Sequence, residues 1–90
     1  MKREVTFNII VRTHGFLGKP GRQLFADYKA EYGTVSPVIK KGGIPHPVHF
    51  REGMQIRNYL RTLDDCQGWS DHDFDDTWTE VVEQVISKGV

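Results

Sequence analysis

Two arginines one helical turn apart are the residues best suited to chemistry in this sequence. Arg57 and Arg61 lie within HFREGMQIRNYLRTL, residues 49–63, and at 100° per residue they share a stripe with Phe50 and Met54. Arginine binds carboxylate and phosphate groups through paired hydrogen bonds, and aromatic and methionine side chains suit adaptable binding surfaces. The pattern therefore predicts a contact surface for an acidic or phosphate-bearing partner.

Three further basic residues extend this predicted surface. Arg51 falls beside the stripe on the same helix, and Lys40 and Lys41 join it if the segment that carries them packs alongside. Nucleic acid is an alternative ligand for the same surface, because lysine and arginine neutralise backbone phosphates. The zero net charge of the whole chain counts against that alternative, since dedicated nucleic-acid binders are usually basic.

A structural explanation of the same helix remains open. A second stripe has the pattern of a helix packed on a core and comprises Gly53, Ile56, Tyr59, Leu60 and Leu63. Phe50 and Met54 would then extend the core, and the two arginines would pair with acidic residues of the same chain.

A glycine-rich run at residues 13–22, THGFLGKPGR, suggests a second kind of site. With His14, Lys19 and Arg22 it resembles in outline the loops whose backbone N–H groups hold an anion or nucleotide. The run has neither the phosphate-loop pattern GxxxxGK[ST] nor the dinucleotide pattern GxGxxG. In addition, Pro20 removes an N–H where a phosphate would need one. Glycine turns also occur for conformational reasons alone.

Metal chemistry has weaker support. His46, His49, Cys66 and His72 form a conceivable zinc set, but only the two histidines of His-x-x-His have close spacing. Aspartates occur at 64, 65, 71, 73, 75 and 76, and helix capping explains several of them without a metal. Cys66 follows two aspartates and lacks the electropositive surroundings of a reactive thiolate, so a structural role is predicted. No cofactor and no catalytic signature are expected, which favours an interaction or regulatory module over an enzyme.

Charge is divided unevenly along the chain. Residues 1–63 carry a net charge of +7 and residues 64–90 a net charge of −7. The two parts can neutralise each other within one fold, or pair between copies as a weak homo-oligomer that dissociates in salt. A single cysteine, a charged beginning and the absence of a long apolar run predict a cytoplasmic protein that does not span a membrane.

The first half of the chain predicts strands and one helix. Residues 3–12 alternate apolar and polar types and are rich in β-branched side chains, which is typical of a strand. Residues 23–32 predict a helix with Leu24, Phe25, Tyr28 and Tyr32 on one stripe. The alternative is a strand in which Leu24, Ala26, Tyr28, Ala30 and Tyr32 alternate with the other residues. Residues 34–41 and 44–49 predict a hairpin around Lys41-Gly42-Gly43, or an extended connector.

The second half predicts two helices, at 49–63 and 71–88. The latter begins with a capping box from Ser70 to Asp73, flanked by Trp69 and Phe74 at hydrophobic-staple spacing, and Gly89 suits its end. The element order β-α-β-β-α-α makes the chain one α+β domain, 1–90, with a three-stranded, mainly antiparallel sheet packed by helices. The sheet gains a fourth strand if 23–32 is extended.

Overall fold

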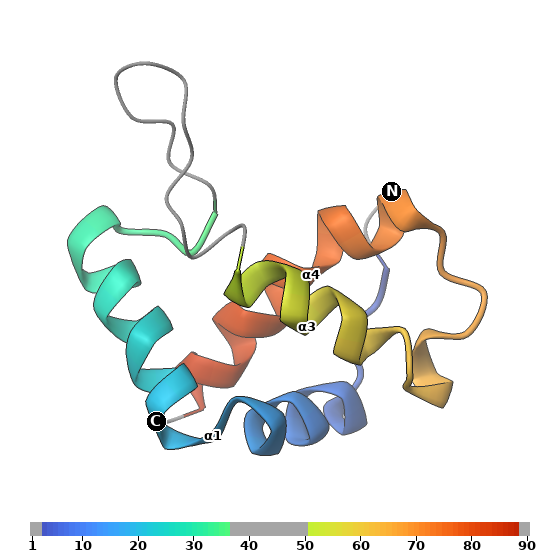
Figure 1. Cartoon of the computed structure of the whole chain (residues 1–90), viewed down its shortest axis with the longest axis horizontal. Helices are drawn as coiled ribbons and strands as arrows, with labels where there is room; N and C mark the ends of the chain where they lie inside the picture. The colour runs from blue at the N-terminus through green and yellow to red at the C-terminus, as the bar shows by residue number, and fades with distance from the viewer. Residues whose placement is uncertain (1–2, 37–50, 89–90) are drawn as a thin grey trace.

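The computed structural model describes residues 3–36 and 51–88, and over those residues every regular element is helical. The elements are α1 (Phe7–Tyr32), α3 (Glu52–Leu60), the 3-10 turn η1 (Asp64–Cys66) and α4 (Asp71–Ser87) (Figure 1). The predicted α+β sheet is therefore wrong for the described part of the chain. The predicted hairpin lies mostly at 37–50, outside the described residues.

The last helix, α4, has the N-terminal signals that the sequence predicts. The backbone N–H of Asp73 donates to Ser70 Oγ at 3.2 Å, and the Ser70 N–H donates to Asp73 Oδ2 at 2.8 Å, which completes the capping box. The Trp69 and Phe74 rings lie 5.3 Å apart, as a hydrophobic staple requires. The buried stripe of α4 comprises Phe74, Thr77, Trp78, Val81, Val82 and Val85. Local signals thus specify where this helix begins.

The middle helix, α3, is shorter than its predicted span of 49–63. Gly53, Ile56 and Leu60 are buried, as the predicted core stripe requires. Gly53 lies directly against Trp78, because a Cβ added there would come within 2.9 Å of the indole Cη2. The glycine therefore allows α3 to approach α4 closely at this point.

The first helix occupies the stretch predicted as a strand and a loop. Thr6 caps it by accepting from the Ile9 N–H at 3.2 Å. Ile9, Ile10 and Thr13 are buried, which is a helical spacing, whereas the alternate residues Phe7 and Val11 are exposed. The β-branched content of 3–12 misled the strand prediction, since tertiary packing overrides such propensities.

A single break divides α1 near its middle. Gly18 has φ 66° and ψ 175°, a conformation that an L-residue adopts only with strain, and Pro20 follows it. The remaining glycines of 13–22 lie in helix, so the predicted glycine-rich loop is wrong. The segment 23–32 is helical, as predicted, and Gly33 ends it with φ 76° and an N–H donated to the Lys29 carbonyl at 2.7 Å.

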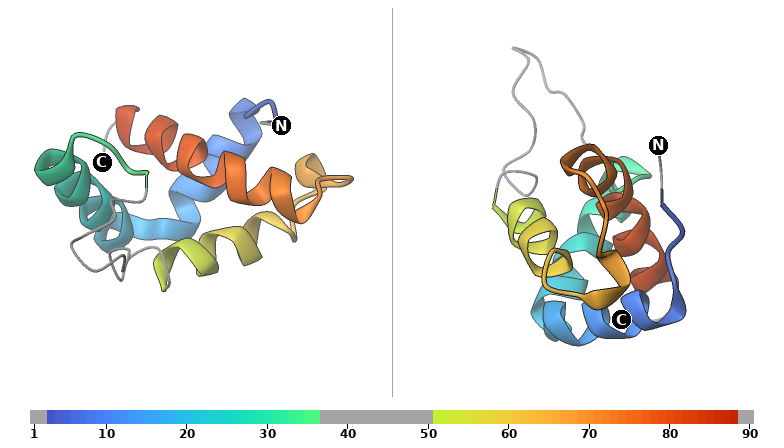
Figure 2. Two further views of the ribbon diagram at one scale, coloured as in Figure 1. Left: turned by 90° about the horizontal axis from the view of Figure 1, so that it is seen from above. Right: turned by 90° about the vertical axis from the view of Figure 1, so that its right-hand side faces the viewer.

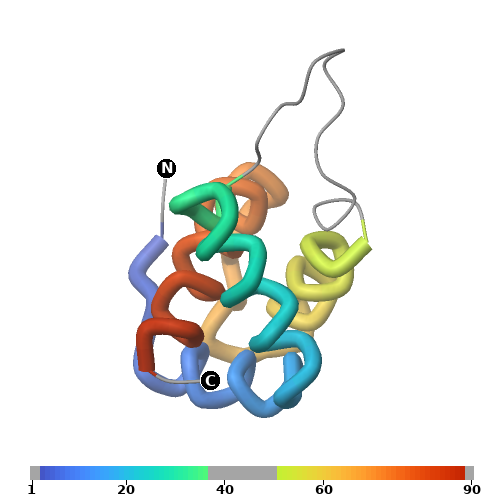
Figure 3. Tube along the Cα trace, turned by 90° about the vertical axis from the view of Figure 1, so that its left-hand side faces the viewer, coloured from blue at the N-terminus to red at the C-terminus, as the bar shows by residue number. Residues whose placement is uncertain are grey.

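Among the helices of the described residues, α4 lies at the centre. The antiparallel pair α3 and α4 is joined by the short connection that carries η1 (Figure 2). The first half of α1 crosses beneath this pair, and the second half rises beside the C-terminal turns of α4 (Figure 3). The core between the helices holds Phe25 and Trp78 edge to face at 6.2 Å, together with the fully buried Val35. Helices α1 and α3 thus cover two sides of α4.

Candidate functional site

A groove between α3 and α4 contains the predicted arginines. Its volume is about 460 Å³, and it is lined by Met54, Arg57, Asn58, Arg61, Asp71 and Asp75. We call this surface the arginine groove. Three of its six residues, Met54, Arg57 and Arg61, were predicted as a partner-binding surface. Asn58 lies on the same helix, and Asp71 and Asp75 come from the facing helix α4.

The arginines face two aspartates in a regular register. Arg57 Nη1 lies 3.5 Å from Asp75 Oδ1, and Arg61 Nη1 lies 2.7 Å from Asp71 Oδ1. Arg61 lies four residues after Arg57, and its partner Asp71 lies four residues before Asp75. The two pairs match because α3 and α4 are antiparallel and side chains four residues apart share a helix face. The groove therefore holds two parallel ion pairs, one helical turn apart.

Each guanidinium also lies over an aromatic ring of α4. The Arg57 Cζ is 5.7 Å from the Trp78 ring centroid, and the Arg61 Cζ is 4.7 Å from that of Phe74. Both distances allow a cation–π attraction, which restricts the side-chain rotamers of the arginines. The guanidinium groups are thus held in place before any partner arrives.

The two ion pairs differ in their exposure to solvent. The Arg61 side chain is 43% exposed and its partner Asp71 is 84% exposed, whereas Arg57 is largely covered. The pair with Asp71 uses one of the five N–H donors of the guanidinium. A carboxylate so open to water binds weakly, and another anion can replace it.

The other predicted members of the surface lie elsewhere. Arg51 pairs with its neighbour Glu52 at 2.8 Å, at the start of α3, and does not line the groove. Lys40, Lys41 and Phe50 lie outside the described residues. Met54 lies on the groove with 51% of its surface exposed, so it is not a core residue.

Sequence reasoning did not place Asn58, Asp71 and Asp75 in the site. The sequence predicts a helix-capping role for several aspartates of residues 64–76, and it leaves open a pairing of the arginines with acidic residues of the same chain. A stronger signal was available in the spacing. Aspartates four residues apart on one helix face arginines four residues apart on an antiparallel neighbour.

The candidate anion site at 13–22 has no loop to form it. His14 is half-buried in the first half of α1, and its backbone carbonyl accepts from Arg22 Nη1 at 2.8 Å. Lys19 is exposed just after the Gly18 break. Arg22 therefore links the two halves of α1 across the kink, and the structure gives it this bridging role in place of the predicted one.

The candidate zinc residues are not assembled in the described part of the chain. Cys66 is buried, and burial, with a smaller contribution from the Asp65 charge, raises the pKa of its thiol to about 11. His72 is exposed in the first turn of α4, and His46 and His49 lie outside the described residues. Within residues 3–36 and 51–88, no three His, Cys, Asp or Glu side chains are grouped closely enough to hold a metal ion.

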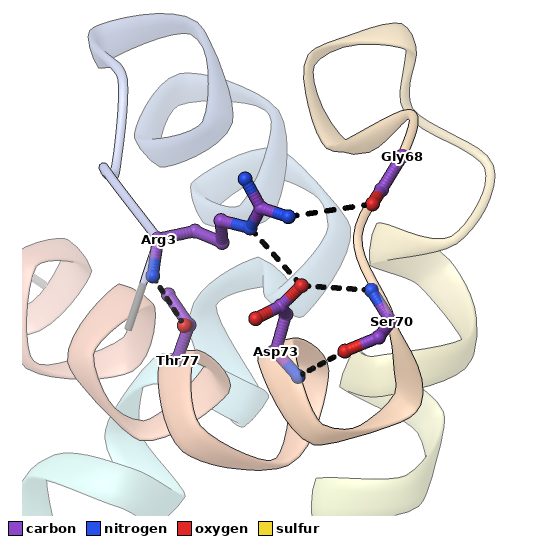
Figure 4. Close-up of polar contacts among 5 residues, drawn as sticks. All are labelled: Arg3, Gly68, Ser70, Asp73 and Thr77. Carbon is purple, nitrogen blue, oxygen red and sulfur yellow. Dashed lines mark hydrogen bonds and ion pairs between the residues drawn. The ribbon is translucent and has the colours of Figure 1, made fainter. Parts of the chain in front are cut away.

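A polar cluster that the sequence did not predict joins the start of the described chain to the beginning of α4 (Figure 4). Arg3 Nε donates to Asp73 Oδ2 at 3.0 Å, and the Arg3 backbone N–H donates to Thr77 Oγ1 at 3.1 Å. Hydrogen bonds from the Ser70 backbone N–H and then from Arg3 hold the pKa of Asp73 below its usual value. The cluster ties the stretch before α1 to the beginning of α4.

A second cluster works in the same way beside η1. Thr6 Oγ1 donates to Asp65 Oδ2 at 2.8 Å, and Asn8 Nδ2 donates to Asp65 Oδ1 at 2.9 Å. These hydrogen bonds, that of Thr6 first, lower the pKa of Asp65. Both clusters have a clear structural role, because their side chains satisfy one another and hold α1 against the α3–α4 connection.

The comparisons with known proteins leave the arginine groove to be interpreted from its own geometry. No protein-family model, curated protein sequence or solved structure matches the chain. In the part of the chain that the structure describes, no helix is both long enough and apolar enough to cross a membrane.

Proposed function

We propose that this chain is a small interaction module that docks an acidic segment of a partner protein in the arginine groove. The observation that carries the proposal is the pair of guanidinium groups held over Trp78 and Phe74 beside the half-exposed Met54. Arginine and aromatic side chains dominate binding hot spots, and methionine adapts to varied surfaces. The groove combines all three.

Binding would proceed by exchange of one carboxylate for another. Asp71 is held by a single short contact to Arg61 and is almost fully exposed, so its release costs little. A glutamate, aspartate or phosphorylated side chain of the partner can then form a two-point contact with the guanidinium. Apolar atoms of the same segment would cover Met54, and exclusion of water there would strengthen the new ion pair.

Nucleic acid is less suited to the same groove. Each arginine has an aspartate directly opposite, so a phosphate backbone would approach two carboxylates together with two guanidinium groups. A protein segment can present one isolated acid to Arg61 and avoid Asp75. Duplex and single-stranded DNA therefore serve as comparison ligands in the experiment that tests the proposal.

Titrations with synthetic peptides test the proposal directly. A glutamate-rich peptide and a phosphoserine peptide are added to the wild-type chain and to Arg61→Gln, with binding followed by tryptophan fluorescence because Trp78 lies under Arg57. The proposal predicts about tenfold weaker binding by Arg61→Gln, the equivalent of one charge-assisted contact. Lys19→Gln removes the same charge from an exposed position outside the groove and is expected to bind like the wild type.

The variant Asp71→Asn separates docking from a purely structural role. Removing the competing carboxylate frees Arg61, so the same peptides should bind more tightly to Asp71→Asn than to the wild type. If the arginines served only to join α3 to α4, Asp71→Asn would leave peptide binding unchanged. Tighter binding of DNA than of either peptide would overturn the choice of a protein partner.

A further inference from the structure

The first turns of α1 expose an apolar surface on a different part of the molecule from the arginine groove. Phe7 is 71% exposed and Val11 is 50% exposed, and a spacing of four residues places both on one face of the helix. Single exposed apolar residues are ordinary, whereas adjoining ones form a patch that marks contact sites. The exposed ring of Phe7 projects from the beginning of the helix.

A hollow lies next to the projecting ring. It has a volume of about 150 Å³ and is lined by Phe7, Ile10, Val11, His14 and Lys88. We call these five residues the α1 patch. A cavity of about this volume with apolar walls holds one benzene molecule in other proteins. The α1 patch therefore presents an aromatic ring and a space for an aromatic ring on the same face.

A surface that carries both a projection and a matching hollow is complementary to a copy of itself. We infer that the α1 patch is the interface of a two-fold symmetric homodimer, in which the Phe7 ring of each copy enters the hollow of the other. In an isologous contact of this kind, each half of the interface is used twice. Both the ring and the hollow come from this chain, so two copies alone can form the contact.

The geometry of α1 suits this arrangement. Phe7 and His14 are seven residues apart, which is about two turns or 10 Å along a helix. If two copies of the first half of α1 pack antiparallel with the axis near Val11, Phe7 of one copy reaches the His14 end of the other. The exposed Gly15, with no atom within 4 Å of the position of a Cβ, leaves room for that approach.

Charges at the two ends of the patch agree with the antiparallel order. Lys88, at the end of α4, is one of the residues that line the hollow, whereas the exposed Glu4 lies three residues before Phe7. In Figure 1 the stretch before α1 and the end of α4 lie at opposite ends of the first half of α1. Antiparallel packing therefore brings Glu4 of each copy toward Lys88 of the other, and parallel packing would not.

The dimer formed in this way is reversible. The first half of α1 spans only residues 7–17, about 16 Å of helix, and its contact is smaller than the ~1,200 Å² that stable specific interfaces bury in total. We therefore expect a dissociation constant on the order of 100 µM. Apolar burial drives the association, so it persists in salt, unlike an oligomer held by the opposite charges of residues 1–63 and 64–90.

Analytical ultracentrifugation of the full chain from about 10 µM to about 1 mM tests the inference. The wild type is expected to change from monomer to dimer over this range, and Phe7→Ser to raise the dissociation constant about tenfold or more. Because Phe7 is exposed in the monomer, its replacement leaves the fold intact. Leu24→Ser, an exposed apolar residue on the second half of α1, is the matched control and should dimerise like the wild type.

A charge reversal tests the antiparallel order. Glu4→Lys should weaken the dimer, and Glu4→Lys combined with Lys88→Glu should restore it. A wild-type chain that stays monomeric at 1 mM would overturn the inference, as would a dimer that Phe7→Ser does not weaken or that salt dissociates. None of these results bears on the arginine groove, because Phe7→Ser leaves that groove unchanged and peptide binding is measured separately.

Discussion

The two neighbours of α4 are held to it by different means. Helix α1 contributes the large buried side chains Ile9, Phe25 and Tyr28 to the core, and its ion pair with α4, Lys29 to Glu83 at 2.6 Å, is partly covered. Helix α3 contributes Ile56 and Leu60, but its exposed edge relies on the arginine–aspartate pairs. Apolar burial is worth far more than exposed ion pairs. The α1 contact is thus the framework, and the edge of α3 can exchange partners at little cost in stability.

The largest expected effect is on the α1 side. Phe25→Ala should lower the free energy of unfolding by about 3–5 kcal/mol, because it removes a fully buried ring packed against Trp78. Urea denaturation measures the loss. Phe16→Ala, which removes a partly exposed ring stacked on Tyr59 at 4.1 Å, is the control and should cost much less. Equal losses would contradict the assignment of the core.

The α3 side depends on one close approach. Gly53→Ala should lower the free energy of unfolding by about 1–3 kcal/mol, because the new Cβ collides with the buried Trp78 ring. Gly15→Ala is the matched helical control, since a Cβ there meets nothing within 4 Å, and it should stabilise by about 0.5–1 kcal/mol. Opposite signs in thermal melts at low protein concentration confirm the contact. Stabilisation by both substitutions would refute it.

Stability should fall in acid through the cluster at the start of α4. Folding lowers the pKa of Asp73, so its stabilising effect is complete above about pH 4 and is lost as the pH falls through the folded value. Melting temperatures measured from pH 7 to pH 2.5 should fall less steeply below pH 4 for Asp73→Asn than for the wild type. Identical profiles would show that Asp73 does not contribute. Asp65→Asn is a useful companion, because the same reasoning applies to its lowered pKa.

The smallest effect is expected at the exposed end of the arginine groove. A double-mutant cycle of Arg61→Gln and Asp71→Asn should give a coupling energy of about 0.2–1 kcal/mol, the range of exposed ion pairs. A coupling energy of several kcal/mol would mean that the pair holds the fold together and cannot exchange with a partner. The cycle therefore sets how easily Asp71 can leave.

The elements that short-range sequence signals specify were predicted correctly, and those that depend on packing between distant residues were not. The beginning of α4 is specified by Ser70 and Asp73 three residues apart, and both the capping box and the helix were predicted correctly. The stretch 3–12 fits both the period of a strand and the period of a helix. Phe7 and Val11, which belong to the strand-like pattern, are exposed. Only packing against α4 selects the helical set of Ile9, Ile10 and Thr13, which a local pattern cannot reveal.

The candidate site was predictable only in part for the same reason. The spacing of Arg57 and Arg61 is visible in the sequence, and it correctly places them on one face of a helix. Their opposition to Asp75 and Asp71 depends on the register between two helices, which the closeness of Gly53 to Trp78 and the connection at 61–70 set. The glycines at 15, 18 and 21 predict a loop, yet of these three only Gly18 has a positive φ.

Docking in the arginine groove is best observed by an NMR titration that follows the side-chain Nε–Hε signals of the arginines. An acidic peptide is added to the isotope-labelled wild type and to Asp71→Asn at physiological salt. If a peptide docks there, the Arg61 signal should shift most, the Arg57 signal should shift less, and Asp71→Asn should reach saturation at a lower peptide concentration than the wild type. Unchanged Arg57 and Arg61 signals in both proteins would contradict docking in the groove, and would leave the two ion pairs as links between α3 and α4 alone.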